Sequence, residues 1–265
     1  MLGIAVDVLK KEEVLDIIVS WLAEKNQKKV RQVVTAYSEY FVVSQADSEF
    51  ARVIKAADLV TADGVSVLAA VKYSRENVGG VGKGLLAGLK VGVDILAGRV
   101  GEPVTGVWLF EELCRMAGKR RWRAFLLGGR EGVAEQATRI ALKRFPGIIA
   151  GYDMGERRIG TDKREDGRVI DKINRFKPDL LFVAFNAIEQ NKWIARRKDV
   201  LKAKVAIGVG GTFDEFSGRL AKPPVWMGRH GLKWLWRLIL EPKRLGRIWR
   251  AVVVFPWLVF RDSLR

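Results

Sequence analysis

Short apolar runs alternate with helix-like stretches through the second half of the chain. The runs are rich in aliphatic and aromatic residues and fall at 124–127, 148–150, 180–184 and 205–209. The stretches between them carry apolar residues at helical spacing, and turns at Pro146-Gly147 and Pro178 close two of them. Strand and helix alternating at this spacing predict a parallel sheet with helices on both faces.

The first half continues this alternation less regularly. Two further strands are expected at 33–35 and 59–61, and helices at 11–25, after Asp47 and at 65–72. We find no internal repeat. Residues 1–218 are therefore predicted to form one α/β domain with a Rossmann-like sheet.

The segment 76–104 interrupts this domain with glycines in an apolar context. Such a composition is unfavourable for a rigid helix in water. One interpretation is an amphipathic insertion with Lys83 and Lys90 facing outward. Its apolar residues would then be buried in lipid or in a partner, namely Leu85, Leu86, Leu89, Val93 and Leu96. The alternative is a glycine-rich helix that packs on the domain.

The charge of the chain is concentrated at its carboxyl end. A formal net charge of +17 predicts an anionic partner, which could be a nucleic acid, a membrane or a phosphorylated substrate. Residues 219–265 hold eleven Lys and Arg against Glu241 and Asp262, together with five of the nine tryptophans. A basic, Trp-rich segment is typical of a membrane interface. We therefore expect a helical C-terminal appendage that lies on an anionic membrane surface.

Three features bear on location. The single cysteine, Cys114, excludes an intramolecular disulfide and fits a reducing compartment. No apolar signal-peptide region follows Met1, and the apolar run 251–260 contains Pro256 and is too short to span a bilayer. We expect a cytoplasmic protein that is peripheral on the inner face of the cell membrane.

Candidate chemistry falls at the carboxyl ends of the predicted strands, where parallel sheets bind ligands. The positions are Thr35, Asp63, Gly128-Gly129, the 186–190 loop and Gly210-Gly211. Taken alone, the glycine pair at 210–211 is either a bend or an anion site at a helix start, and Asp63 is either a helix cap or a general base. Their convergence at one edge of the sheet favours the functional interpretation of each.

Several other chemistries lack their residues. The chain has no pair of aspartates at i and i+2, so no acidic metal clip is expected. The single histidine, His230, lies in the basic tail, and no serine stands in a nucleophile-elbow pattern. Residues 128–132 match the dinucleotide fingerprint only loosely. We expect neither a metal nor a cofactor. The negative charge of a diphosphate would have to be balanced by arginines and helix amino ends.

An ordered set of stretches resembles the WecG/TagA/CpsF glycosyltransferases. The stretches are 35–39, 62–64, 125–129, 183–193, 208–214 and 231–242, so the resemblance covers nearly the whole chain. It implies transfer of N-acetylmannosamine, or a related sugar, from a UDP donor onto a polyprenyl-diphosphate-linked N-acetylglucosamine, with inversion. The product would belong to cell-surface polysaccharide or teichoic-acid-type synthesis. The family is similarly metal-independent and includes homo-oligomers.

The resemblance also implies roles for individual residues. Asp63 is the implied catalytic base. The implied substrate-binding residues are Thr35 and Gln190 in the sugar pocket, Tyr152, Gly210, Gly211 and Asp214 near the uridine and diphosphate, and Arg237 and Arg244 on the lipid diphosphate.

The chain also departs from the family pattern. Tyr37 stands where the family commonly has asparagine, Trp108 and Glu189 replace other common residues, and the 76–104 segment is longer than the family requires. Tyr37 and Glu189 motivate an alternative, a non-catalytic protein that binds a sugar nucleotide or lipid on the same scaffold. The +17 charge motivates a nucleic-acid-binding protein, but the resemblance favours partners other than nucleic acid. A dinucleotide-dependent oxidoreductase is the remaining alternative.

Overall fold

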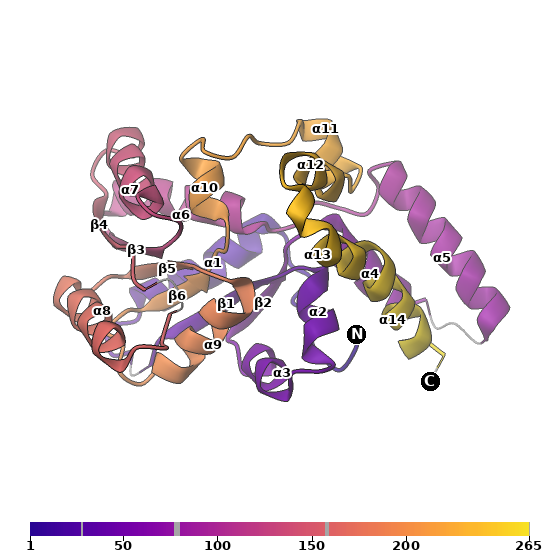
Figure 1. The fold of residues 1–265 in the computed structure, drawn as a ribbon, viewed down its shortest axis with the longest axis horizontal. Coiled ribbons are helices and arrows are strands. Elements are labelled where there is room, and N and C mark those ends of the chain that lie inside the picture. Colours follow the sequence, from indigo (N-terminus) through magenta and orange to yellow (C-terminus); the bar gives the residue numbers. More distant parts are fainter. Residues whose placement is uncertain (28, 77–79, 157–158, 265) are drawn as a thin grey trace.

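The computed structural model describes residues 1–27, 29–76, 80–156 and 159–264, and within them six strands form one parallel sheet (Figure 1). The strands are β1 (Arg31–Ala36), β2 (Leu59–Ala62), β3 (Arg123–Gly128), β4 (Ile149–Asp153), β5 (Leu180–Ala184) and β6 (Val205–Gly208). Their order across the sheet is β2-β1-β6-β5-β3-β4. The predicted α/β fold with a parallel sheet is confirmed.

Helices cover both faces of the sheet because the strands are apolar on both sides. One face packs against α1 (Lys11–Ala23), α6 (Gly106–Arg120) and α7 (Val133–Arg144). The other packs against α2 (Ser38–Ser44), α3 (Ser48–Lys55) and α4 (Val65–Ser74) at one end, and α8 (Lys163–Phe176) and α9 (Ala187–Arg197) at the other. Strands β2, β5 and β6 are buried along their whole length.

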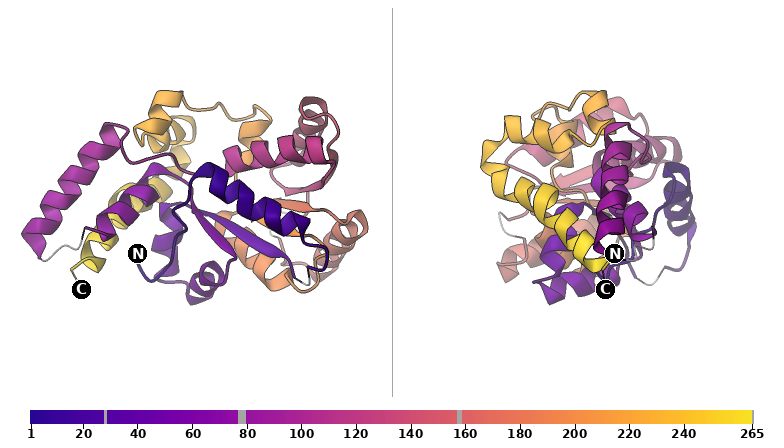
Figure 2. Two further views of the ribbon diagram at one scale, coloured as in Figure 1. Left: turned by 180° about the vertical axis from the view of Figure 1, so that it is seen from behind. Right: turned by 90° about the vertical axis from the view of Figure 1, so that its right-hand side faces the viewer.

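Helix α5 (Val81–Leu96) stands at the edge of the molecule and contacts the domain mainly through α4 (Figure 2). Its buried positions are Gly84, Val91 and Asp94, and Lys72 of α4 pairs with Asp94 at 2.6 Å. Leu85, Leu86 and Leu89 are exposed, so the domain does not bury them. The helix packs on the domain as the second interpretation expected, while burial of its leucines in lipid or in a partner stays a prediction. Residues 77–79 of the expected insertion lie outside the described residues.

The chain from Arg219 onward forms a helical appendage that returns to the carboxyl edge of the sheet. It follows α10 (Thr212–Phe216) and consists of α11 (Val225–Arg229), α12 (Lys233–Leu240), the 3₁₀ turn η1 (Pro242–Arg244), α13 (Leu245–Trp249), the π-helical η2 (Arg250–Val254) and α14 (Phe255–Asp262). Phe255 of α14 is 1% exposed and contacts Phe41 of α2, with 5.7 Å between the ring centroids and 44° between the ring planes. The backbone amide of Leu2 donates to Asp262. The appendage thus shares a hydrophobic core with the domain.

Within the described ranges, none of the helices combines the length and the apolar character needed to cross a bilayer.

Gly208, the last residue of β6, allows α9 to approach the sheet closely. A Cβ atom at this position would lie 2.7 Å from Gln190 Nε2 and 2.8 Å from Asn191 Oδ1. We predict that Gly208→Ala lowers the free energy of unfolding by about 1–3 kcal/mol, because α9 must shift to relieve the overlap. Urea unfolding followed by circular dichroism measures this loss.

Gly167→Ala on α8 is the matched control, since no atom lies within 4 Å of a Cβ there. We expect it to be neutral or stabilising by up to about 1 kcal/mol, from helix propensity. Equal stability of Gly208→Ala and the wild type would contradict the close packing.

Candidate active site

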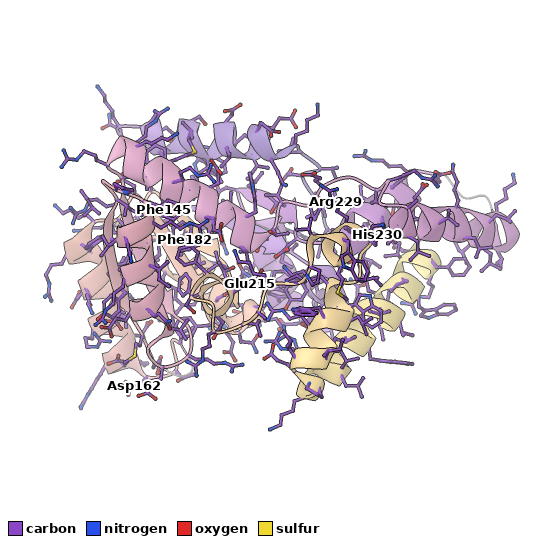
Figure 3. All side chains as sticks on the ribbon, turned by 90° about the horizontal axis from the view of Figure 1, so that it is seen from above. Phe145, Asp162, Phe182, Glu215, Arg229 and His230 are labelled. Atoms are coloured by element: carbon purple, nitrogen blue, oxygen red, sulfur yellow. The ribbon has the colours of Figure 1, made fainter. Side chains whose placement is uncertain are left out.

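A cleft of about 1360 Å³ lies between the carboxyl ends of the strands and the appendage. Residues that follow β1, β2, β3, β5 and β6 line it on the domain side. The cleft brings together eight of the residues expected from the sequence, namely Thr35, Asp63, Gln190, Gly210, Gly211, Asp214, Arg237 and Arg244. Figure 3 shows Glu215 beside the appendage helices at this cleft. Side chains from both ends of the chain therefore face one space.

Asp63 follows β2 directly and is only partly exposed. Its Oδ2 accepts a hydrogen bond of 3.3 Å from the backbone amide of Gly106, the first residue of α6. Burial in the cleft raises the pKa of the Asp63 carboxyl, and the nearby charge of Glu215 raises it further, whereas Lys233, the Gly106 amide and Arg237 oppose the shift. A carboxylate with a raised pKa at the floor of a cleft is suited to act as a general base.

Gln190 fixes the turn that follows β6. Its side chain is 1% exposed, and its Oε1 accepts from the amides of Gly210 at 3.0 Å and Phe185 at 3.1 Å. Gly210 has φ +53°, a left-handed conformation that favours glycine. One glutamine thus joins the loops after β5 and β6.

The hydrogen bonds to Gln190 change the expected role of the turn at Gly210-Gly211. Because the Gly210 amide already donates to Gln190, it is not free to bind an anion. The nearest cation is Arg237, whose Nη2 lies 3.8 Å from the position of a Cβ on Gly211. The positive charge at this turn therefore comes from an arginine rather than from the Gly210 amide.

Thr35 and Asp214 occupy two walls of the cleft. The Thr35 hydroxyl is buried and donates to the backbone oxygen of Gly208 at 3.1 Å, which links the ends of β1 and β6. Asp214 lies on α10, one turn after the glycine pair, and is half-buried. Both positions agree with the placement expected from the sequence.

Three arginines surround the carboxylate of Glu241. Arg244 contacts it at 2.8 Å, Arg130 at 3.1 Å and Arg237 at 3.3 Å. Arg237 also reaches the buried Glu215 at 3.3 Å. Burial and the neighbouring charges of Arg247 and Arg237 lower the pKa of Arg244, although Glu241 opposes this. The cations outnumber the carboxylates here, so the cluster favours a ligand with several negative charges, such as a diphosphate.

Glu39 attaches the appendage to the domain. This carboxylate is 5% exposed and accepts from Arg247 and Arg250, each at 2.8 Å, and from the Tyr37 hydroxyl at 3.0 Å. Burial alone would raise the pKa of Glu39, but Arg250 and Arg247 outweigh it and hold the pKa below its ordinary value. The start of α2 is thereby linked to α13 and η2.

Tyr152 is the one expected site residue that the structure does not bring to the cleft. It lies on the edge strand β4, and its ring centroid is 5.8 Å from Lys172 Nζ. The residues just after this strand, Met154, Gly155 and Glu156, line the cleft instead. The loop after β4 therefore contributes to the cleft, and Tyr152 does not.

The departures from the family pattern differ in their position. Tyr37 and Trp108 both line the cleft, and the Tyr37 hydroxyl also contacts Arg247. Glu189 is exposed on α9 and is not among the lining residues. Only the first two replacements can therefore alter the shape of the site directly.

Sequence reasoning assigned no role to Glu39, Glu215, Glu241, Arg130 or Arg247. Glu39 and Glu241 lie inside the stretches that resemble the glycosyltransferase family, and this position was the one sign in the sequence that they could have a role. Their partners are distant in sequence, however: Glu39 and Arg247 are 208 positions apart. In the described part of the chain, no three His, Cys, Asp or Glu side chains are grouped so that they could hold a metal ion.

Comparison with known proteins identifies relatives. A family model described as "Glycosyl transferase WecG/TagA/CpsF family" matches residues 1–84 and 81–265. Three similar proteins are each named N-acetylglucosaminyldiphosphoundecaprenol N-acetyl-beta-D-mannosaminyltransferase. The protein of Bacillus spizizenii (strain ATCC 23059 / NRRL B-14472 / W23) is 30% identical over 87% of this chain and 78% of its own length.

The other two matches are shorter. The Bacillus subtilis (strain 168) protein is 35% identical over 60% of this chain, and the Staphylococcus aureus (strain MRSA252) protein is 29% identical over 57%. Each of these alignments covers 58% of the relative's length.

Glu39→Gln tests the attachment of the appendage. Because the folded-state pKa of Glu39 is lowered, its ion pairs stabilise the docked appendage above the ordinary Glu pKa of about 4.3 and are lost as the pH falls through the folded-state pKa. We expect amide hydrogen exchange in α13 and η2 to rise at least about tenfold at pH 7 in this variant. The difference from wild type should shrink at low pH.

Glu76→Gln, which removes an exposed partner of Lys90, is the control and should leave exchange in α13 unchanged. Unchanged protection in Glu39→Gln would show that Glu39 does not hold the appendage.

Proposed function

The chain belongs to the WecG/TagA/CpsF glycosyltransferase family, and we propose that it transfers N-acetylmannosamine, or a related sugar, from a UDP donor to a polyprenyl-diphosphate-linked acceptor. The observation that carries this proposal is the shared cleft, in which Asp63 of the domain faces the arginine cluster of the appendage. The names of the relatives support the sugar and the acceptor. The product would serve cell-surface polysaccharide or teichoic-acid-type synthesis.

Asp63 is the proposed base. Its carboxylate takes the proton from the acceptor hydroxyl as the hydroxyl oxygen attacks the anomeric carbon of the donor. The bond between that carbon and the UDP phosphate oxygen breaks on the opposite side, so the anomeric configuration inverts. The raised pKa of Asp63 supports this role, because a stronger base accepts the proton more readily.

The leaving group is a diphosphate and requires positive charge. Arg237 lies beside the Gly210-Gly211 turn and Lys233 lies near Asp63, so both are placed to stabilise the departing UDP. We assign Arg244, on the next turn of the appendage, to the lipid diphosphate. These side chains supply the charge that a metal ion provides in other enzymes, and we propose that transfer is metal-independent.

The remaining site residues position the substrates. We assign Asp214 and Gly211 to the uridine side, and Thr35 and Gln190 to the sugar pocket, where Gln190 acts by holding the two loops together. The basic appendage would hold the enzyme on the inner face of the membrane, where a polyprenyl-linked acceptor resides. We also propose that the enzyme forms a homo-oligomer.

Asp63→Asn tests the assignment of the base. We expect UDP release to fall by about 10²–10⁴-fold, while the affinity for UDP changes less than about threefold, because the amide cannot accept the proton. In the wild type, kcat/KM should rise with pH through the raised pKa of Asp63, since the carboxylate must be deprotonated. A coupled assay for UDP with UDP-N-acetylmannosamine and a lipid-diphosphate acceptor, run across pH, measures both.

Wild-type protein that binds UDP but turns over no UDP-sugar would instead favour the non-catalytic binding protein. Full activity of Asp63→Asn would exclude Asp63 as the base.

Arg237→Gln tests stabilisation of the leaving group. We expect kcat to fall by about 10–10³-fold, because the charge on the departing diphosphate loses its closest cation at the turn. Arg139→Gln makes the same change on the outer side of α7, where the arginine pairs only with Glu135 one helical turn earlier, and should retain wild-type kcat. Steady-state kinetics distinguish the two, and an unchanged kcat in Arg237→Gln would remove Arg237 from the mechanism.

A further inference from the structure

Helix α5 presents a continuous apolar face that no other part of the described chain covers. Six aliphatic residues on this helix are each between 56% and 69% exposed, namely Val81, Leu85, Leu86, Leu89, Val93 and Leu96. At 100° per residue they fall within about 140° of the helix circumference. Lys83 and Lys90 follow at one margin of this face. The opposite side of the helix carries Gly84, Val91 and Asp94, which are buried against the domain.

Helix α5 lies next to the appendage. The right-hand view of Figure 2 shows α5 next to the appendage helices on the side turned to the viewer. Contacts join the two, because a Cβ on Gly231 of the appendage would lie 2.8 Å from Ile95 of α5. The Tyr73 hydroxyl on α4 also reaches both the Gly84 backbone oxygen, at 3.3 Å, and the Ser263 hydroxyl, at 3.1 Å.

The appendage adds exposed aromatic and apolar residues to this side. Trp226, Trp249 and Trp257 are each more than half exposed, and they are interspersed with basic residues. Tryptophan beside lysine and arginine is the composition found where proteins meet the lipid headgroup region.

We propose that α5 is a second lipid-binding element, which inserts its apolar face into the boundary between headgroups and acyl chains of an anionic bilayer. Lys83 and Lys90 at the margin of the face would then lie at the level of the lipid phosphates. The helix contains sixteen residues, so it is about 24 Å long and lies in the plane of the membrane rather than across it.

The charge and size of this surface favour lipid over a second copy of the chain. A helix about 24 Å long and about 10 Å wide offers roughly 240 Å², whereas each partner in a stable interface buries about 800 Å². A second copy would also bring its own net charge of +17 to the same side. An anionic bilayer satisfies both the apolar face and the basic margin.

This inference rests on the proposed function only in that a lipid-linked acceptor requires the enzyme to work at a membrane. The binding itself involves no substrate. It can therefore be measured whether or not the protein proves to be a transferase.

The test is flotation of the full chain with vesicles of phosphatidylcholine containing phosphatidylglycerol. The variant Leu86→Ser/Leu89→Ser removes two of the most exposed leucines, and we expect its partition onto vesicles to fall roughly tenfold or more. The control Leu142→Ser/Val200→Ser changes two exposed residues elsewhere, one on α7 and one after α9. It should float like wild type. Circular dichroism confirms that each variant is folded.

Lys83→Gln/Lys90→Gln separates the two contributions. We expect the preference of this variant for phosphatidylglycerol to weaken by about threefold or more, because the basic appendage still contributes to it, while the weaker binding to pure phosphatidylcholine is kept. Wild-type flotation of Leu86→Ser/Leu89→Ser would overturn the proposal. So would light scattering that shows a wild-type dimer converted to a monomer by the same change, because a second copy would then cover α5.

Discussion

A single buried carboxylate, Glu39, anchors the appendage over the carboxyl edge of the sheet. The residue is 5% exposed and is paired with Arg247 and Arg250, which are 208 and 211 residues later in the chain. A buried pair of this kind gives little net stability, but removal of one partner leaves an uncompensated charge, so the arrangement is specific. Because Glu39 stands at the start of α2, directly after β1, the appendage is held over the carboxyl edge of the sheet. The cleft exists only in this docked arrangement.

The docked arrangement divides the chemistry between the two ends of the chain. The domain supplies Asp63, whose pKa rises with burial, and the turn that Gln190 holds in place. The appendage supplies Arg237 and Arg244, which share the carboxylate of Glu241. A domain without its appendage would keep Asp63 and Arg130 and lose Arg237 and Arg244. We propose that the same helices attach the protein to the membrane, and in that case attachment and completion of the site are coupled.

Much of this arrangement is predictable from the sequence. Apolar runs ending in Thr35, Asp63 and the glycine pair locate the strand ends, because the carboxyl ends of parallel strands share one edge. The pairing of Glu39 with Arg247 depends on tertiary structure and leaves no local pattern. The Gly210 amide was expected to face an anion, but a glutamine twenty residues earlier occupies it. Tyr152 lies within the edge strand β4 rather than in the loop after it, which lines the cleft. The apolar pattern of residues 76–104 left open which side of that helix packs on the domain.

The central claim is that docking of the appendage through Glu39 completes the active site. A double-mutant cycle on UDP release tests it most directly, with Glu39→Gln, Arg250→Gln and the double variant. Arg250 does not line the cleft, so any effect on turnover must act through docking. The account predicts that each single change lowers kcat and that the double variant is no slower than the slower single variant. Wild-type turnover in both single variants, or losses that simply add, would contradict it.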